Sequence, residues 1–225
     1  MMLKAIAFDL DGTLYPAISA VRPTIPLVIR HPLFMYQFSR TRTLVRKLDE
    51  PRDFQLKQTR ILAHLLNKSE SQIKDKLNKI IYQDWIACFK RIRPFPGIRE
   101  VILSLRQKGY KTALLSDMPI EEKISFLKLE GLWDVAFCSE GTGFLKPHSA
   151  PFKRLLAELN CKAEETLFIG NSYKYDVRGA KACGLKTALL SRRMYHKGDL
   201  KPDYQFRNYR QLRKFLLDLE KLSGP

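Results

Sequence analysis

Two aspartates, Asp9 and Asp11, directly follow a short apolar run, Ile6-Ala7-Phe8, which predicts a buried strand. Residues two positions apart on an extended chain point to the same face, so the two carboxylates should lie side by side. Gly12 then permits a sharp turn. Such a pair at the end of a buried strand either binds a hard cation or divides the roles of nucleophile and acid/base. The plainer interpretation of this segment alone is an Asp-Gly turn with a solvated second aspartate.

Polar side chains also follow three later runs that predict strands. Ser116 comes after one run, Lys146-Pro147 follows another, and Asn171 and Asp176 come after a third. In a parallel sheet the carboxyl ends of the strands share one edge, which is where open α/β sheets bind ligands. Four loops would therefore bring carboxylates, a hydroxyl, an amide and a lysine together, and this combination favours a chemical site over a simple turn.

The elements that must position these residues alternate regularly after the sequence Pro94-Phe95-Pro96-Gly97, which marks a boundary. Strands are predicted at Thr112–Leu115, Val135–Cys138, Thr166–Ile169, Lys186–Leu190 and, more weakly, Tyr204–Phe206. Amphipathic helices are predicted at Ile98–Gly109, Ile120–Leu129, Ser149–Leu159, Val177–Cys183 and around Leu212–Leu219. This alternation predicts an α/β fold, with a parallel sheet and helices on both faces.

Residues 15–93 follow a different pattern, because their apolar residues recur at helical spacing. Ser69 and Gln72 have the spacing of a capping box that opens one helix. The prolines between positions 16 and 32 predict turns and a short helix at the entry. The run Pro32–Phe38 is apolar and aromatic, so it forms either a contact with a membrane or partner or, as we favour, the inner face of a small helical bundle.

The composition bounds the partners and the compartment. The net charge is +17, and residues 15–95 hold 16 Lys and Arg against 6 Asp and Glu, while the remaining residues hold 24 against 17. Such a field favours phosphorylated metabolites, nucleic acid or an acidic membrane face, although a basic surface can also be merely solvated. The four cysteines are dispersed without a C-x-x-C pair, which predicts reduced and mostly buried thiols. With no signal peptide and no bilayer-spanning run, we expect a cytoplasmic protein.

Taken together and in order, these motifs resemble those of the haloacid dehalogenase superfamily of phosphohydrolases. The first motif, D-x-D-G-T-L, is present at Asp9–Leu14, and the second and third correspond to Ser116 and Lys146-Pro147. The fourth, usually G-D-S-x-x-x-D, corresponds to Gly170–Asp176, with Asn171 where the family usually has a metal-binding aspartate. The resemblance covers residues 1–14 and roughly 95–210, and the helical insert is similar to the family's C1-type cap.

The resemblance implies a Rossmann-like catalytic core of residues 1–14 and 95–225, and an all-helical cap of residues 15–94 that chooses the substrate. It assigns catalytic roles to Asp9 as nucleophile, Asp11 as acid and base, Ser116 and Lys146, and phosphate binding to Ser116, Asp117 and Lys146. The implied Mg²⁺ ligands are Asp9, the backbone carbonyl of Asp11, Asn171 and Asp176. Lys146 is expected to keep Asp9 ionised, since a nearby cation lowers the pKa of a carboxyl group.

The function predicted from these assignments is a Mg²⁺-dependent phosphatase that hydrolyses a small phosphorylated metabolite through an aspartyl-phosphate intermediate. One alternative is a phosphomutase with the same aspartyl chemistry. Another is a catalytically weak binding module whose basic cap binds nucleic acid or anionic lipid, although no nucleic-acid motif supports it. The basic residues Arg40, Arg42, Arg46 and Lys47 of the insert either reach the anionic part of a substrate or form a solvated helix face.

Overall fold

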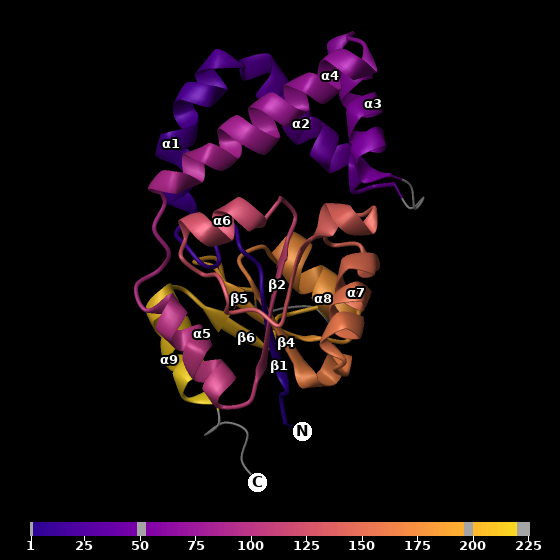
Figure 1. The fold of residues 1–225 in the computed structure, drawn as a ribbon. Helices are drawn as coiled ribbons and strands as arrows, with labels where there is room; N and C mark the ends of the chain where they lie inside the picture. The colour runs from indigo at the N-terminus through magenta and orange to yellow at the C-terminus, as the bar shows by residue number, and fades with distance from the viewer. Residues whose placement is uncertain (1, 49–52, 196–199, 220–225) are drawn as a thin grey trace.

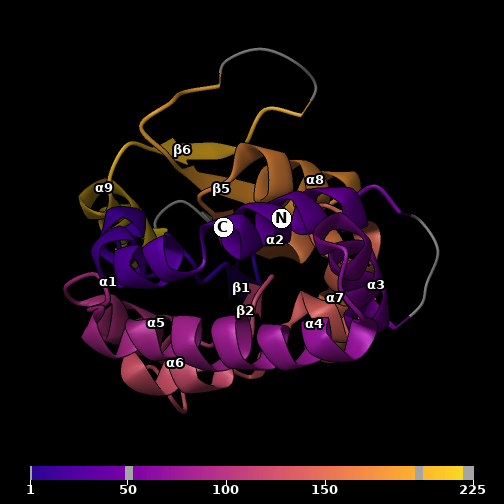
Figure 2. The same cartoon turned by 90° about the horizontal axis from the view of Figure 1, so that it is seen from above.

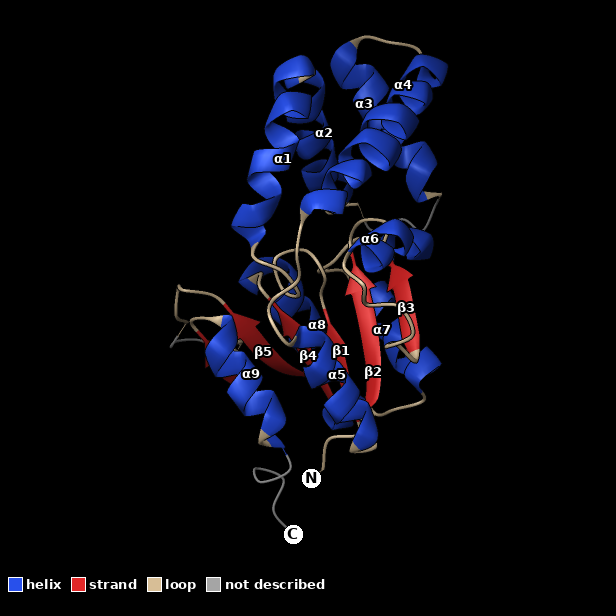
Figure 3. Ribbon diagram, turned by 60° about the vertical axis from the view of Figure 1, so that its left-hand side comes forward, coloured by secondary structure: helices blue, strands red, loops and turns tan. Residues whose placement is uncertain are grey.

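The protein is built around a six-stranded parallel sheet with the strand order β3-β2-β1-β4-β5-β6. The computed structural model describes residues 2–48, 53–195 and 200–219. The strands are β1 (Ala5–Phe8), β2 (Lys111–Ser116), β3 (Val135–Cys138), β4 (Thr166–Gly170), β5 (Lys186–Leu190) and β6 (Tyr204–Phe206), and Figures 1 and 3 show their common direction. The predicted α/β fold and its strands are confirmed.

Alternation along the central strand explains the two apolar layers that cover the sheet. In β1, Ile6 and Phe8 belong to one buried cluster, whereas Ala5 and Ala7 belong to the cluster on the opposite face. Helices α5 (Ile98–Gln107) and α9 (Tyr209–Leu217) contribute to the first cluster, and α7 (Ser149–Leu159) and α8 (Arg178–Ala182) to the second. Because both faces are covered, nearly every residue of the central strands is buried, and most of these residues are apolar.

A second layer of helices lies over the carboxyl edge of the sheet (Figures 1 and 2). It consists of α1 (Ala17–Arg30), α2 (Pro32–Val45), α3 (Phe54–Leu66), α4 (Glu70–Lys76), the π-helical segment η1 (Leu77–Trp85) and the 3₁₀ segment η2 (Cys88–Arg91). The capping box of Ser69 and Gln72 is present at the start of α4. Phe34 and Phe38 lie in the buried cluster of this layer, as the bundle interpretation requires, but Leu33 and Tyr36 are exposed.

The segment rich in prolines differs from its prediction, because α1 is one helix of 14 residues with Pro23 and Pro26 inside it. A proline in a helix removes a backbone N–H and leaves a carbonyl one turn earlier without its partner. The carbonyls affected are those of Ser19 and Arg22, four residues before each proline. The Thr24 hydroxyl donates to their neighbours, the carbonyls of Ala20 and Val21, at 2.8 and 2.9 Å. No residue of α1 is buried, so carbonyls left without a partner can bind water. The expectation of turns and a short helix was therefore wrong.

Three smaller observations complete the fold. All four cysteines are free, and each is partly exposed, which corrects the expectation that most are buried. Among the described residues, no helix combines the length and the apolar character that a membrane span needs. Short segments join β1 and α5 to the helical layer, and they are held together where the Phe95 N–H donates to the Leu14 carbonyl at 2.9 Å.

Candidate active site

The residues predicted to carry chemistry come together at the carboxyl edge of the sheet, beneath the helical layer (Figure 1). Asp9 follows β1, Ser116 ends β2, and Asn171 follows β4, and these three strands are neighbours in the sheet. Lys146 comes from the loop between β3 and α7. Parallel pairing alone therefore explains why residues more than 100 positions apart meet.

The Lys146 ammonium group lies between two buried carboxylates. Its Nζ donates to Asp9 Oδ1 and to Asp176 Oδ1, both at 2.7 Å, and to the Leu115 carbonyl at 3.3 Å. The exposed fractions of Asp9, Lys146 and Asp176 are 5%, 2% and 1%. Burial without a partner would strongly disfavour each charge, so one ammonium group stabilises both carboxylates.

Asp9 is more readily protonated than the sequence indicated. Burial raises its pKa to about 7, and the opposing attraction of Lys146 does not overcome this effect. Lys146 does lower the pKa of Asp9, as expected, but the loss of water on burial, which the expectation left out, is the larger effect. Thr13 donates its hydroxyl to Asp9 Oδ2 at 2.9 Å, so both carboxylate oxygens are oriented by the protein.

Asp11 is held by a lysine that sequence reasoning missed. Lys123, on α6 (Glu121–Phe126), donates to both Asp11 carboxylate oxygens at 2.8 and 2.9 Å, and its exposed fraction is 1%. The Tyr15 hydroxyl donates to Asp11 Oδ1 at 2.7 Å. A signal was present, because Lys123 shares a helical stripe with the buried residues Ile120 and Leu127. A lysine at a core position of an amphipathic helix needs an acidic partner.

Ser116 and Asp117, which were predicted to bind phosphate, already bind other groups of the protein. Ser116 donates to Asp11 Oδ2 at 3.3 Å and accepts the Met118 N–H at 3.2 Å. The Asp117 carboxylate accepts from Arg46 at 2.8 Å, Ser139 at 2.6 Å and the Lys146 N–H at 3.0 Å. Although burial opposes ionisation, Lys146 and Arg46 hold the pKa of Asp117 below its usual range. The side chain of Asp117 therefore supports the loop, and phosphate binding by this residue stays a prediction.

The predicted metal ligands are adjacent and have suitable chemistry. Asn171 donates its side-chain N–H to the Asp11 carbonyl at 3.0 Å, and Asp176 Oδ2 accepts the Ser172 N–H at 2.9 Å. A Cβ at position 12 would lie 2.1 Å from the Asn171 amide nitrogen, so only glycine there allows this approach. Rotation of the Asn171 amide group about its last side-chain bond would exchange the positions of its nitrogen and oxygen, and the oxygen could then bind a metal ion.

The donor set includes few charged groups. No cluster of three or more His, Cys, Asp and Glu side chains that could bind a metal occurs within residues 2–48, 53–195 and 200–219. Mg²⁺ typically keeps several waters and uses one or two carboxylates, so Asp9 and Asp176 with a carbonyl and an amide oxygen fit this ion. They fit less well with an ion that needs a cage of side chains.

Two arginines, Arg42 in α2 and Arg46 at its C-cap, reach from the helical layer to the edge of the sheet. Arg42 donates to the Asp117 carbonyl and pairs with Glu140. Arg46 pairs with the Asp117 carboxylate at 2.8 Å and donates to the Lys146 carbonyl at 3.0 Å. These contacts join the end of α2 to two loops at the carboxyl edge of the sheet. Arg40 and Lys47 are exposed, as a solvated helix face requires, whereas Arg42 and Arg46 bind groups of the protein itself. Whether any of the four contacts a substrate stays a prediction.

Comparisons with known proteins place this geometry in a family. Residues 3–184 match the family described as haloacid dehalogenase-like hydrolase. A glyceraldehyde 3-phosphate phosphatase of Pyrococcus abyssi is 31% identical over 201 residues, covering 83% of this chain and 80% of that protein. Pyrophosphatase PpaX of Bacillus mycoides is 24% identical over 219 residues, covering 91% and 92%.

A structural comparison agrees at the level of the fold. The magnesium-bound putative HAD-hydrolase YfnB of Bacillus subtilis, whose structure is described as revealing interdomain movement, superposes with a TM-score of 0.67. The two chains are 18% identical, and 96% of this chain and 99% of that chain are covered. The relatives support the predicted phosphoric monoester hydrolase. On the match to most of its length, the chain belongs to the haloacid dehalogenase-like hydrolases.

Proposed function

We propose that the protein is a Mg²⁺-dependent phosphatase that hydrolyses a small phosphorylated metabolite through an aspartyl-phosphate on Asp9. The observation that carries this proposal is the buried group of Asp9, Lys146 and Asp176, which lies next to Asp11 at the ligand-binding edge of the sheet. The phosphatase relatives point in the same direction. We place the protein in the cytoplasm, where its four free cysteines suit reducing conditions.

The proposed reaction has two steps, both performed by the two aspartates. A carboxylate oxygen of Asp9 forms a bond to phosphorus while the bond from phosphorus to the ester oxygen breaks, and Asp11 gives a proton to that oxygen. Asp11 then takes a proton from the water that attacks phosphorus and releases Asp9. Lys146, Ser116 and backbone N–H groups stabilise the charge on the phosphoryl oxygens.

Magnesium, when held by Asp9, the Asp11 carbonyl, Asn171 and Asp176, would supply further positive charge to the phosphoryl group. Two other residues, Thr13 and Lys146, orient the nucleophile, because each binds one oxygen of Asp9. Lys123 and Tyr15 keep the Asp11 carboxylate beside Ser116. Lys123 and Tyr15 thereby fix the direction in which the two Asp11 oxygens point.

We propose that residues 15–94 act as a cap and that residues 1–14 and 95–225 form the catalytic core. Arg42 and Arg46 support this division, because they bridge from α2 to loops that follow strands of the sheet. The Leu14 to Phe95 hydrogen bond brings the outgoing and returning connections together, which is a suitable place for a hinge. Closure excludes water during the first step.

The full chain should release phosphate from p-nitrophenyl phosphate when MgCl₂ is present, and EDTA should stop the release. A panel of phosphorylated sugars, nucleotides, triose phosphates and pyrophosphate then identifies the substrate. No release from any of these compounds, with the metal present and the protein folded by circular dichroism, would refute the phosphatase. Transfer of phosphate to a second sugar, with none released to water, would assign a phosphomutase in its place.

Replacing Asn171 by aspartate should tighten Mg²⁺ binding, since a charged oxygen ligand binds this ion more strongly than an amide. We expect the Mg²⁺ concentration for half-maximal phosphate release to fall about tenfold, which corresponds to about 1.4 kcal/mol. Asn208→Asp is the matched control, because Asn208 caps α9 and lies away from the site. An unchanged midpoint in Asn171→Asp would show that residue 171 does not contact the ion.

Replacing Lys123 by methionine should slow turnover, because the Asp11 carboxylate then loses the ammonium group that orients it. General acid–base catalysis contributes about 10²–10⁴-fold, so we expect kcat to fall on the order of 100-fold with little change in KM. Lys123→Arg should recover part of the rate. Lys153→Met, on the exposed side of α7, is the control. If KM rose on the order of 100-fold and kcat did not change, Lys123 would instead have a role in substrate binding.

A further inference from the structure

The apolar stripe of α1 faces away from the helical layer. Residues spaced three and four apart lie on one side of a helix, and five aliphatic residues of α1 have this spacing. All five are exposed, with exposed fractions of 42–76%: Ile18, Val21, Ile25, Val28 and Ile29. The opposite side of the helix, with Ala20 and Leu27, packs against the buried clusters. An amphipathic helix usually turns its apolar stripe to the core, whereas the apolar stripe of α1 is exposed to solvent.

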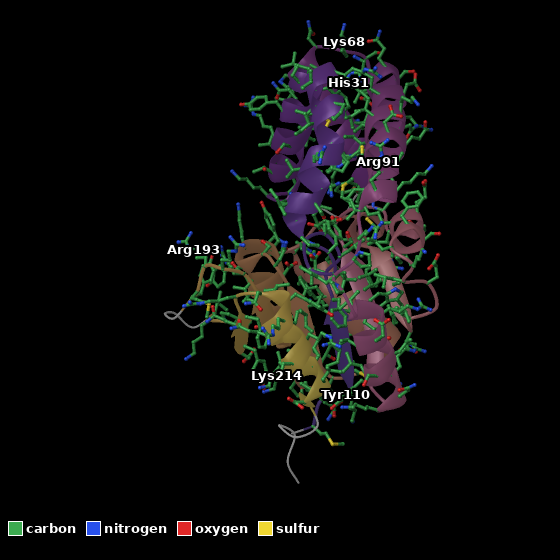
Figure 4. The ribbon with its side chains drawn as sticks, turned by 90° about the vertical axis from the view of Figure 1, so that its left-hand side faces the viewer. His31, Lys68, Arg91, Tyr110, Arg193 and Lys214 are labelled. Atoms are coloured by element: carbon green, nitrogen blue, oxygen red, sulfur yellow. The ribbon has the colours of Figure 1, made fainter. Side chains whose placement is uncertain are left out.

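The same surface continues into the start of α2. Leu33 and Tyr36 are 62% and 64% exposed, whereas their neighbours Phe34 and Phe38 are buried. We call these seven side chains the outer face: Ile18, Val21, Ile25, Val28, Ile29, Leu33 and Tyr36. Figure 4 views this side of the molecule, with His31 between the two helices at the upper end. Single exposed aliphatic residues are common, but seven within residues 18–36 mark an interaction surface.

The charge around the outer face indicates which partner covers it. Residues 12–48 contain six Lys and Arg but no Asp or Glu. Arg42 and Arg46 turn to the core, while Arg22 and Arg30 on α1 and Arg40 on α2 are exposed. A second copy of the chain, paired face to face, would bring these arginines together with no acid of the segment to neutralise them. The complementary partner is therefore anionic and apolar at once.

We propose that the outer face docks on the surface of an anionic lipid bilayer. Helices with an apolar face and flanking basic residues lie in the interface, with the apolar side chains about 5–10 Å into the boundary between headgroups and acyl chains. The arginines then meet anionic headgroups, and Tyr36 has the amphipathic ring that suits this boundary. Nucleic acid would use the arginines but would leave the aliphatic residues in water.

Docking in this way leaves the contacts between the helical layer and the sheet edge intact. In Figure 1, α1 lies at the outer edge of the helical layer. The contacts of Arg42 and Arg46 with the sheet edge come from the second half of α2, beyond the outer face. Binding to lipid therefore needs neither of these contacts to break. The inference does not depend on the proposed phosphatase activity, and each can fail without the other.

The test is co-sedimentation of the full-length chain with vesicles. We expect binding to phosphatidylcholine vesicles that contain about 30 mol% phosphatidylglycerol, weaker binding as salt rises, and little binding to pure phosphatidylcholine. The triple variant Ile18→Glu, Ile25→Glu, Ile29→Glu should bind at least about tenfold more weakly, because three side chains no longer enter the bilayer. The double variant Arg22→Glu, Arg30→Glu should show a loss of about tenfold or more.

Matched controls separate the outer face from general charge and general hydrophobicity. Leu103→Glu places a glutamate at an exposed aliphatic residue outside the outer face, on α5. The double variant Lys153→Glu, Lys214→Glu reverses two exposed charges on α7 and α9. These variants should bind vesicles like the natural chain. If the controls lost as much vesicle binding as the outer-face variants, the binding would be due to diffuse electrostatic attraction and not to the outer face. No binding of the natural chain to the anionic vesicles would refute the proposal.

Two further measurements complete the test. A dimer in sedimentation velocity that the Ile18, Ile25 and Ile29 variant converts to monomer would assign the outer face to a second copy and overturn the lipid assignment. Asp9→Asn should bind vesicles normally, and the triple variant should release phosphate from the substrate found by the panel at the normal rate without vesicles. Loss of vesicle binding in Asp9→Asn would also contradict the proposed site, because Asp9 is buried beneath the helical layer.

Discussion

Asp9→Asn should abolish phosphate release, with a fall of about 10³-fold or more in kcat. The amide has nearly the shape of the carboxylate, but its oxygen carries no charge and is a poor nucleophile. Its nitrogen would also face either the Lys146 ammonium group or the Thr13 hydroxyl, both of which donate to Asp9 now. Steady-state phosphate release with MgCl₂ measures the effect, and a labelled substrate should leave no acid-stable phosphate on the variant.

The control for this variant is Asp84→Asn, the same chemical change at a partly exposed aspartate that pairs with Lys79 in η1. It should keep full activity. Thermal unfolding must show that Asp9→Asn is folded, and we expect it to be, because the amide removes a charge from a buried site. Activity of Asp9→Asn above about a tenth of normal would remove Asp9 as the nucleophile and with it the two-step reaction.

The fold was accessible from the sequence because its signals are local. Short apolar runs and amphipathic helices alternate after residue 97, and the observed strands agree with the predicted ones to within one or two residues. The exception is α1, where Pro23 and Pro26 favour turns in any reading by local rules. Only the side of α1 with Ala20 and Leu27 packs against the buried clusters, so the apolar stripe on its other side has no role in the packing of the described residues. Local patterns could not contain that information.

The site was predictable in its members but not in its contacts. Strand ends in a parallel sheet determine that Asp9, Ser116 and Asn171 converge, and this much follows from topology. The pairing of the side chains depends on how deeply each one is buried and on the direction in which it points. Burial raises the pKa of Asp9, and Lys123 enters from a helix for which no motif was recognised. Both effects arise from packing between elements distant in the sequence.

The second large effect is expected for Lys146→Met, measured as the free energy of unfolding in urea at pH 7 without Mg²⁺. The variant leaves Asp9 and Asp176 buried without the ammonium group that lies 2.7 Å from both. Breaking a buried ion pair by removing one partner costs about 3–5 kcal/mol. Lys4→Met is the matched control, because Lys4 also pairs at 2.7 Å, with Glu165, but is 58% exposed. That change should cost less than about 1 kcal/mol.

The loss in Lys146→Met should also depend on pH in a definite direction. Burial raises the pKa of Asp9 to about 7 even beside Lys146, and without the lysine two buried carboxyl groups compete for one proton and the pKa rises further. A carboxyl group whose pKa is raised by folding stabilises the protein at low pH, and this stability is lost as the pH rises through the folded-state pKa. The natural chain should therefore level off above pH ~7, whereas the variant continues to lose stability.

A second substitution makes this prediction independent of whether the single variant folds. Adding Asp176→Asn to Lys146→Met removes one of the two buried charges, and the double variant should recover most of the lost stability and much of the dependence on pH. Equal stability of Lys146→Met and Lys4→Met would mean that water or a rearrangement reaches the carboxylates. A double variant no more stable than the single one would mean that methionine fails there by its shape. Only recovery in the double variant identifies charge as the cause, and thereby Lys146 as the cation that lets two acids share one buried site.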